Sequence, residues 1–177
     1  MRGIRTLPLP RESPTITSVH VRPASRRRPR TPAVYLRGAE AVSYLTLASL
    51  AIRFVPFKRL VPVFTRPLPR PELTGPARSR AIADVRRAVL SAAVRLPNRP
   101  VCFPQALAAQ AMLRRRGVAT TMCYGANTAG GKGLAAHVWL LAGDEGVVGQ
   151  EIAAQFPLLV TYSNGRAPRD ADLVAEP

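Results

Sequence analysis

The chain of 177 residues contains few cysteines, few aromatic side chains and few acidic side chains. Its two cysteines, Cys102 and Cys123, are too few for a disulfide framework in a chain of this length. The longest apolar run, residues 41–52, is about 12 residues long, whereas a membrane-spanning helix needs about 20. No apolar signal segment closely follows Met1 and its arginines. We therefore expect a cytoplasmic protein with reduced thiols and no contact with a membrane.

Acidic residues are scarce: the chain has 10 Asp and Glu against 26 Lys and Arg, which gives a formal net charge of +16. Such an excess fits either an arginine-rich composition without a role of its own or an acidic partner. Aromatic residues make up only 6% of the chain, which leaves few rings for stacking on bases. The arginines are also spread over several predicted helices. These observations argue against a nucleic-acid-binding module, which stays as a rival interpretation.

The composition divides the chain into three parts. Residues 1–33 are rich in Arg, Pro, Ser and Thr, and they offer little apolar surface to offset the entropy cost of ordering. We expect a disordered tail there, one folded domain over residues 34–165 and a frayed end over residues 166–177.

Helical spacing of apolar residues dominates the first half of the predicted domain. A helix is expected from residue 39, and it should be largely buried because Val42, Leu45 and Leu50 cover more than one face. Prolines at positions 56 and 62 end it. Further helices are expected over residues 77–96 and 104–116, followed by strands over residues 118–124, 136–141 and 147–150. Helices followed by an antiparallel sheet predict the α+β class.

Cys102 opens the helix-like segment over residues 101–117. The thiolate is the nucleophilic form of cysteine, and the positive end of a helix and a neighbouring imidazole both favour it. Backbone N–H groups at that end can also hold the oxyanion formed in acyl transfer. A single cysteine is more often a small buried hydrophobic residue, and we interpret Cys123, within an apolar strand, in that way.

His137 begins a strand-like run and is the only histidine after His20. In a thiol enzyme it would take the proton of Cys102 and later protonate the leaving amine, although most single histidines are structural. Trp139, two residues further along the strand, shares its face and is either a wall of the same cleft or ordinary core. Residues 130–133 (GGKG) lack the spacing of a phosphate-binding loop, so we expect no cofactor and no metal.

Three short motifs together suggest a family. Cys102-Phe103-Pro104 opens an alanine-rich helix, Arg115-Arg116-Gly117 ends it, and His137-Val138-Trp139 lies in the next strand but one. Their order and spacing over about residues 39–162 resemble the leader peptidase of lasso peptide biosynthesis. That enzyme is the transglutaminase-like half of the split lasso B protein.

The resemblance implies a papain-like, transglutaminase-like cysteine peptidase fold with a Cys-His-Asp triad. Cys102 and His137 match its first two members. The family's acid lies about a dozen residues after the histidine, where this chain has Gln150, followed by Glu151. A glutamine can orient the imidazole through its amide oxygen, so Gln150 is preferred, with Glu151 as the alternative if the strand shifts by one residue.

The resemblance also implies a substrate and partners. The enzyme would cut a ribosomally made precursor peptide between leader and core, by acyl transfer to the thiol and then to water. A small winged-helix protein would bind the leader, because residues 1–33 are too short for such a domain. A separate cyclase resembling asparagine synthetase would close the freed core into a macrolactam. Two alternatives remain open besides nucleic-acid binding: another transglutaminase-like acyl or amide transferase, and a scaffold that has lost its activity.

Overall fold

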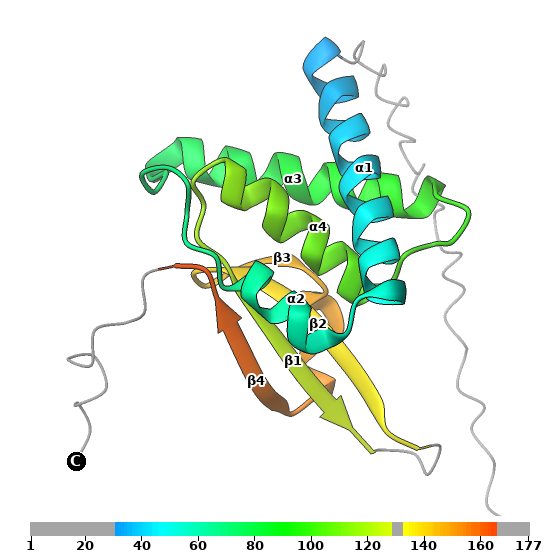
Figure 1. Cartoon of the computed structure of the whole chain (residues 1–177). Coiled ribbons are helices and arrows are strands. Elements are labelled where there is room, and N and C mark those ends of the chain that lie inside the picture. The colour runs from blue at the N-terminus through cyan, green and yellow to red at the C-terminus, as the bar shows by residue number, and fades with distance from the viewer. Residues whose placement is uncertain (1–30, 129–132, 166–177) are drawn as a thin grey trace, which may run out of the picture.

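The computed structural model describes residues 31–128 and 133–165 of the chain. Four α-helices come first and an antiparallel sheet follows, which confirms the predicted α+β class (Figure 1). The helices are α1 (Pro32–Phe54), α2 (Phe57–Phe64), α3 (Gly75–Arg95) and α4 (Cys102–Arg115). The strands are β1 (Thr121–Asn127), β2 (Ala135–Ala142), β3 (Glu145–Val148) and β4 (Leu158–Ser163), with a 3-10 helix, η1 (Gln150–Gln155), before β4.

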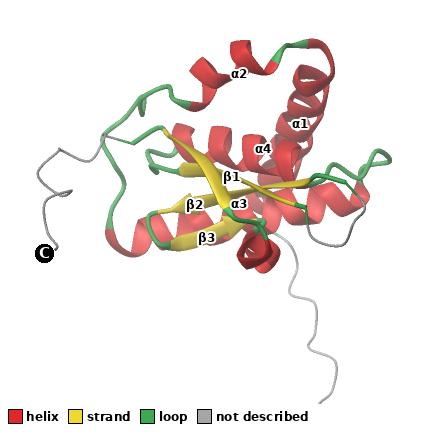
Figure 2. Ribbon diagram, turned by 90° about the horizontal axis from the view of Figure 1, so that it is seen from below, coloured by secondary structure: helices red, strands yellow, loops and turns green. Residues whose placement is uncertain are grey.

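The four strands form one sheet in the order β3-β2-β1-β4, with antiparallel neighbours. Helices α3 and α4 cover one face of this sheet, α2 contacts β4 at its edge, and α1 packs on α3 and α4 (Figures 1 and 2). Residues of η1 and the turn after it pack against the other face. In the register of β1 and β2, His137 stands opposite Gly125. Both central strands are therefore covered on both faces.

Two apolar clusters fill the spaces on either side of the sheet. The cluster on the helix side contains Ala106 and Ala109 of α4 together with Val138 and Leu140 of β2. The smaller cluster on the other side contains Cys123, Trp139 and Ala153. The split follows from strand geometry, because successive side chains of a strand point to opposite faces.

Helix α4 ends where the sequence predicts. Gly117 has a φ of +76°, and the N–H of Val118 donates to the carbonyl of Leu113 over 3.0 Å, as in a glycine-terminated helix. A Cβ at Gly117 would stand 2.6 Å from the carbonyl oxygen of Pro71. The Gly117 carbonyl in turn accepts from the N–H of Leu73 over 2.7 Å. The end of α4 therefore also fixes the connection between α2 and α3.

The prediction of a largely buried first helix is wrong. Ala41, Leu45 and Ala48 are buried, whereas Leu47 and Phe54 are 61% and 76% exposed. One stripe of α1 packs against α3 and α4, and the rest of its apolar surface faces outward. Across residues 31–128 and 133–165, no helix combines the length and the apolar character that a bilayer crossing requires.

Several predicted boundaries also differ. Helix α1 begins at Pro32, within the predicted tail, because proline fits the first turn of a helix. A separate helix, α2, follows Pro56 and contains Pro62 in its interior. The third strand is shifted to Glu145–Val148, which moves Gln150 into η1. The remaining residues of the predicted tails, 1–30 and 166–177, lie outside the described part of the chain.

Leu45 and Leu47 give a matched pair for testing this packing. We expect Leu45→Ala to lower the free energy of unfolding by about 2–5 kcal/mol, because it leaves a cavity between helices. Leu47→Ala removes the same atoms from a side chain that is 61% exposed, and it should cost less than about 1 kcal/mol. Urea unfolding followed by circular dichroism measures both. Equal losses would contradict the packing described for α1.

Candidate active site

Cys102 is the first residue of α4 and is half-buried. Its predecessor Val101 is extended and makes no side-chain cap, and the N–H of Gln105 donates to the Val101 carbonyl over 3.2 Å to begin the helix. The Gln105 amide nitrogen also donates to the carbonyl of Pro100 over 2.7 Å, which links the first turn of the helix to the segment before it. The thiol therefore stands at the positive end of a helix dipole.

Aromatic side chains surround this helix end. The Phe103 ring lies 5.6 Å from the Tyr124 ring and 6.0 Å from the Phe57 ring, and Tyr124 meets Tyr162 edge-on at 5.6 Å. Burial raises the pKa of Tyr124 above its ordinary value, and the nearby Tyr162 and Cys102 raise it further. Tyr124 therefore stays a neutral phenol, and its hydroxyl donates to Sδ of Met122 over 3.3 Å. The sequence alone does not point to Tyr124, because its environment is formed by residues from distant segments.

His137 is only 6% exposed and is held on three sides. Its ring stacks on Trp139 at 5.9 Å with an interplanar angle of 17°, and it lies 5.1 Å from the ring of Phe156. Its Nε2 is 2.7 Å from the carbonyl oxygen of Gly149. A carbonyl oxygen only accepts, so Nε2 carries the proton in this contact. In the neutral ring Nδ1 then has the lone pair that a base needs.

The site residues expected from the sequence occupy two layers. Cys102 packs with the cluster on the helix side, together with Val138 and Leu140. His137 alternates with Val138 along β2, so it faces the η1 side with Trp139. In the described part of the chain no hydrogen bond joins the thiol to the imidazole. The structure therefore does not bring the two side chains together.

The structure gives neither Gln150 nor Glu151 the orienting contact with His137. Gln150 opens η1, and a Cβ at Gly146 would meet its Cβ and Cγ at 2.9 Å, so its side chain lies against β3 at Gly146. Glu151 is exposed and its Oε1 lies 3.4 Å from Nη2 of Arg86. The backbone carbonyl of Gly149 holds the imidazole instead. Residue type could not reveal this contact, because any residue supplies a carbonyl.

Gly149 can make this contact because of its conformation. Its φ is +77°, and a Cβ there would stand 2.7 Å from the carbonyl oxygen of Val138. Only glycine therefore fits between β3 and η1 without displacing β2. Within the described residues there is also no cluster of three or more His, Cys, Asp or Glu side chains suited to a metal ion.

A family comparison agrees with this architecture. The model of the transglutaminase-like superfamily matches residues 44–161, and the chain belongs to that superfamily. The superfamily includes cysteine peptidases and transferases and is generally catalytic. The comparisons with curated proteins and with solved structures gave no match. The match spans both the helix that begins with Cys102 and the strand that carries His137.

The two cysteines should differ in reactivity. Cys102 is half-buried, whereas Cys123 is buried and burial raises the pKa of its thiol above the ordinary value. A raised pKa means that the Cys123 thiolate forms only at higher pH, so at pH 8 iodoacetamide should modify Cys102 at least about tenfold faster. Peptide mass spectrometry over a time course measures both rates. The urea-unfolded chain gives the reference rates of the two thiols. Equal rates in the folded protein would contradict the expected difference between Cys102 and Cys123.

The Gly149 contact can be tested against a second glycine of positive φ. Gly149→Ala should lower the free energy of unfolding by roughly 1–3 kcal/mol more than Gly143→Ala. At Gly143, with a φ of +58°, the nearest atom to a Cβ is the flexible end of the Arg78 side chain at 3.2 Å. The His137 ring N–H signal in nuclear magnetic resonance should be protected from water exchange in the wild type and in Gly143→Ala, and lost in Gly149→Ala. Equal behaviour of the two variants would show that Gly149 does not hold the ring.

Proposed function

We propose that this protein is a cysteine peptidase that removes the leader from a ribosomally made lasso precursor peptide. The observation that carries the proposal is Cys102 at the first residue of α4 in a chain of the transglutaminase-like superfamily. The order of the Cys-Phe-Pro, Arg-Arg-Gly and His-Val-Trp motifs supports the choice of lasso precursors as substrates. The substrate class rests on this resemblance, and the thiol chemistry rests on the superfamily and the helix end.

In the proposed mechanism the Cys102 thiolate attacks the carbonyl carbon between leader and core. The Nδ1 of His137 takes the thiol proton and gives it to the leaving amine of the core peptide, so that a thioester joins the leader to Cys102. Backbone N–H groups at the start of α4 stabilise the oxyanion. Water, deprotonated by the same nitrogen, then releases the leader as a carboxylic acid and restores the thiol.

This mechanism requires Cys102 and His137 to approach each other when substrate binds. Contacts between catalytic groups in free enzymes are often long and shorten only in the substrate complex. Here the two side chains also lie on different faces of the sheet, so the proposed mechanism requires a shift at the start of α4. The Gly149 carbonyl takes the place of the family's aspartate, since it fixes Nε2 and leaves Nδ1 for the thiol. Trp139 stacks on the ring and keeps its plane fixed.

The proposed partners follow from the proposed reaction. The precursor peptide is the substrate, and a small winged-helix protein presents its leader. A cyclase resembling asparagine synthetase then joins the freed core amine to an acidic side chain. The other candidate in the same superfamily is an acyl or amide transferase, in which an amine replaces water at the thioester. The two reactions share every residue named above and differ only in the product.

Cleavage of a precursor peptide tests the proposal. The full-length protein, its leader-binding partner and the precursor are mixed, and mass spectrometry follows the products. We expect free leader acid and core peptide, with Cys102→Ala and His137→Ala each slowing cleavage by roughly three orders of magnitude or more. Cys123→Ala should keep the rate within about threefold, since Cys123 lies in the opposite cluster.

The products separate the alternatives. Cleavage that survives Cys102→Ala would exclude the thiol mechanism. A leader joined to an added amine, in place of a leader acid, would identify a transferase. Loss of cleavage in Cys102→Ala but not in His137→Ala would assign another base to the thiol.

A further inference from the structure

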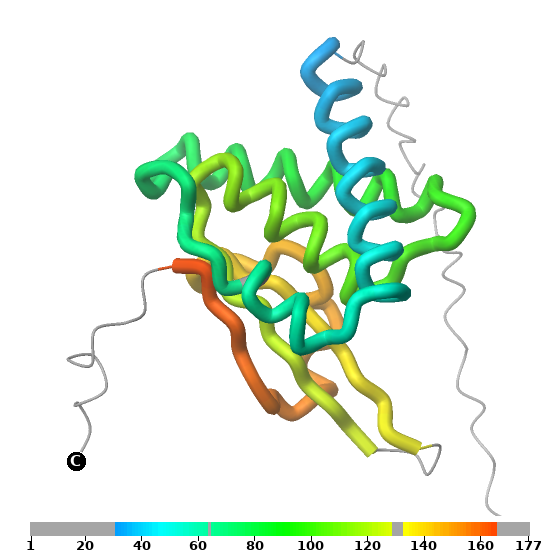
Figure 3. The backbone as a smooth tube through the Cα atoms, in the orientation of Figure 1, coloured from blue at the N-terminus to red at the C-terminus, as the bar shows by residue number. Residues whose placement is uncertain are grey.

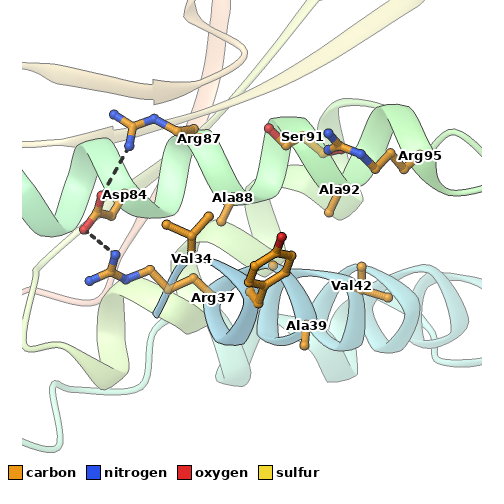
Figure 4. Close-up of a pocket in the computed structure, with 12 residues that line it drawn as sticks. Val34, Arg37, Ala39, Val42, Asp84, Arg87, Ala88, Ser91, Ala92 and Arg95 are labelled. Carbon is orange, nitrogen blue, oxygen red and sulfur yellow. Dashed lines mark hydrogen bonds and ion pairs between the residues drawn. The ribbon is translucent and has the colours of Figure 1, made fainter. Parts of the chain in front are cut away.

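An apolar groove of about 330 Å³ lies between the N-terminal half of α1 and the second half of α3 (Figure 4). Val34 and Val42 of α1 and Ala88 and Ala92 of α3 form its apolar lining. The lining residues of α3 run from Asp84 to Arg95, which is about three helical turns or roughly 16 Å. The groove is therefore elongated along two helices, and a third helix matches that shape better than a compact ligand does.

Small residues line both walls of the groove. Gly38 and Ala39 stand on α1, and Ala88, Ser91 and Ala92 stand on α3. Small side chains let the ridge of an incoming helix enter the space between two others. A Cβ added at Gly38 would meet nothing within 4 Å, so the wall there is open.

The rim of the groove is positively charged. Arg37 and Arg87 both pair with Asp84, with Nη1 at 3.0 Å from Oδ2 and at 3.6 Å from Oδ1 respectively. Arg95 donates to the carbonyl of Ser91 in its own helix. The lining residues thus include three guanidinium groups and one carboxylate, which gives a formal excess of two positive charges. Each guanidinium has five N–H donors, so donors remain for further carboxylates.

The beginning of α1 adds to this positive potential. Thr31, at the N-cap, makes no side-chain hydrogen bond to the helix, and the first turn contains no acidic residue. The N–H groups at the start of a helix carry a partial positive charge that favours anions. This end of α1 lies beside the groove, next to Val34.

The groove is separate from the candidate active site, because neither Cys102 nor His137 lines it. The N-terminal half of α1 projects from the helical layer on the side away from the sheet (Figures 1 and 3). Exposed apolar surface continues there, because Tyr35 and Leu36 are 64% and 72% exposed.

We propose that this groove binds an amphipathic helix of a separate protein, with its apolar stripe in the groove and its Asp or Glu side chains on Arg37, Arg87 and Arg95. Charge complementarity favours an acidic partner over a second copy of the chain. The chain has 26 Lys and Arg against 10 Asp and Glu, so a second copy would mostly bring further positive charge to the rim. The proposal does not depend on peptidase activity.

A designed peptide tests the groove directly. The probe is a fluorescein-labelled 18-residue helical peptide with leucines at positions i, i+3, i+4 and i+7 and glutamates beside them, and a control peptide has lysines in place of glutamates. Fluorescence anisotropy with the full chain should show at least tenfold tighter binding of the glutamate peptide. Val42→Glu should weaken that binding at least tenfold, because it puts a carboxylate into the groove.

Matched variants separate the groove from the general positive charge. Leu47→Glu adds the same charge to another exposed position of α1 and should change binding less than twofold. Arg53→Glu reverses an exposed charge outside the groove and should also change binding less than twofold, whereas Arg95→Glu reverses a charge at the rim and should weaken binding more. Circular dichroism must show that each variant is folded. Equal weakening by Val42→Glu and Leu47→Glu, or equal binding of the two peptides, would overturn the proposal. So would sedimentation showing a wild-type dimer that only Val42→Glu dissociates, because the occupant would then be a second copy.

Discussion

The close packing of α4 between the other helices and the sheet is the constraint on which the rest of the structure depends. This helix contacts α1 and α3 on one side and β2 and β3 on the other. Ala106, Ala108 and Ala109 are at most 1% exposed, and their small side chains let the helix backbone approach the neighbouring helices and strands. Larger side chains at these positions would displace α4 from its neighbours and move its first residue, Cys102, with it. The position of the thiol is thus determined by packing one to two turns further along the helix.

Much of this arrangement can be predicted from the sequence, because the strongest signals are local. The helix over residues 77–96, the stop at Gly117 and the two central strands all depend on periodicity or on turn residues, and the structure confirms them within a few residues. The exposure of α1 could not be predicted in this way. Its apolar residues cover several faces, and periodicity does not show which of them finds a neighbour. Nor did the prolines at 56 and 62 predict α2, since one precedes the helix and the short helix accommodates the other.

The candidate site also shows that a local sequence pattern does not identify which residues become neighbours in the fold. The two-residue period correctly predicts that His137 and Trp139 share a face of the strand. Which face that is cannot be read from AAHVWLLA, because both faces of β2 are apolar and both are buried. The partner of the imidazole is equally hidden, since it is a backbone carbonyl placed by the left-handed conformation of Gly149. A search for a carboxylate or an amide at that point in the chain leads to Gln150 and Glu151, whose side chains lie elsewhere.

In the proposed mechanism one of the two catalytic side chains has to move, and the contacts favour movement of the thiol. His137 is buried between two rings, and its Nε2 contacts Gly149 over 2.7 Å, so turning the ring would leave a buried polar group without a partner. The segment before Cys102 is less constrained. Arg99 has a φ of +38°, a conformation that costs a residue other than glycine about 1–3 kcal/mol, and the apolar side chain of Val101 is 68% exposed. Relaxation of Arg99 and burial of Val101 against a bound peptide would both favour a shift at the start of α4. The substrate itself would then help to bring the thiol toward the imidazole.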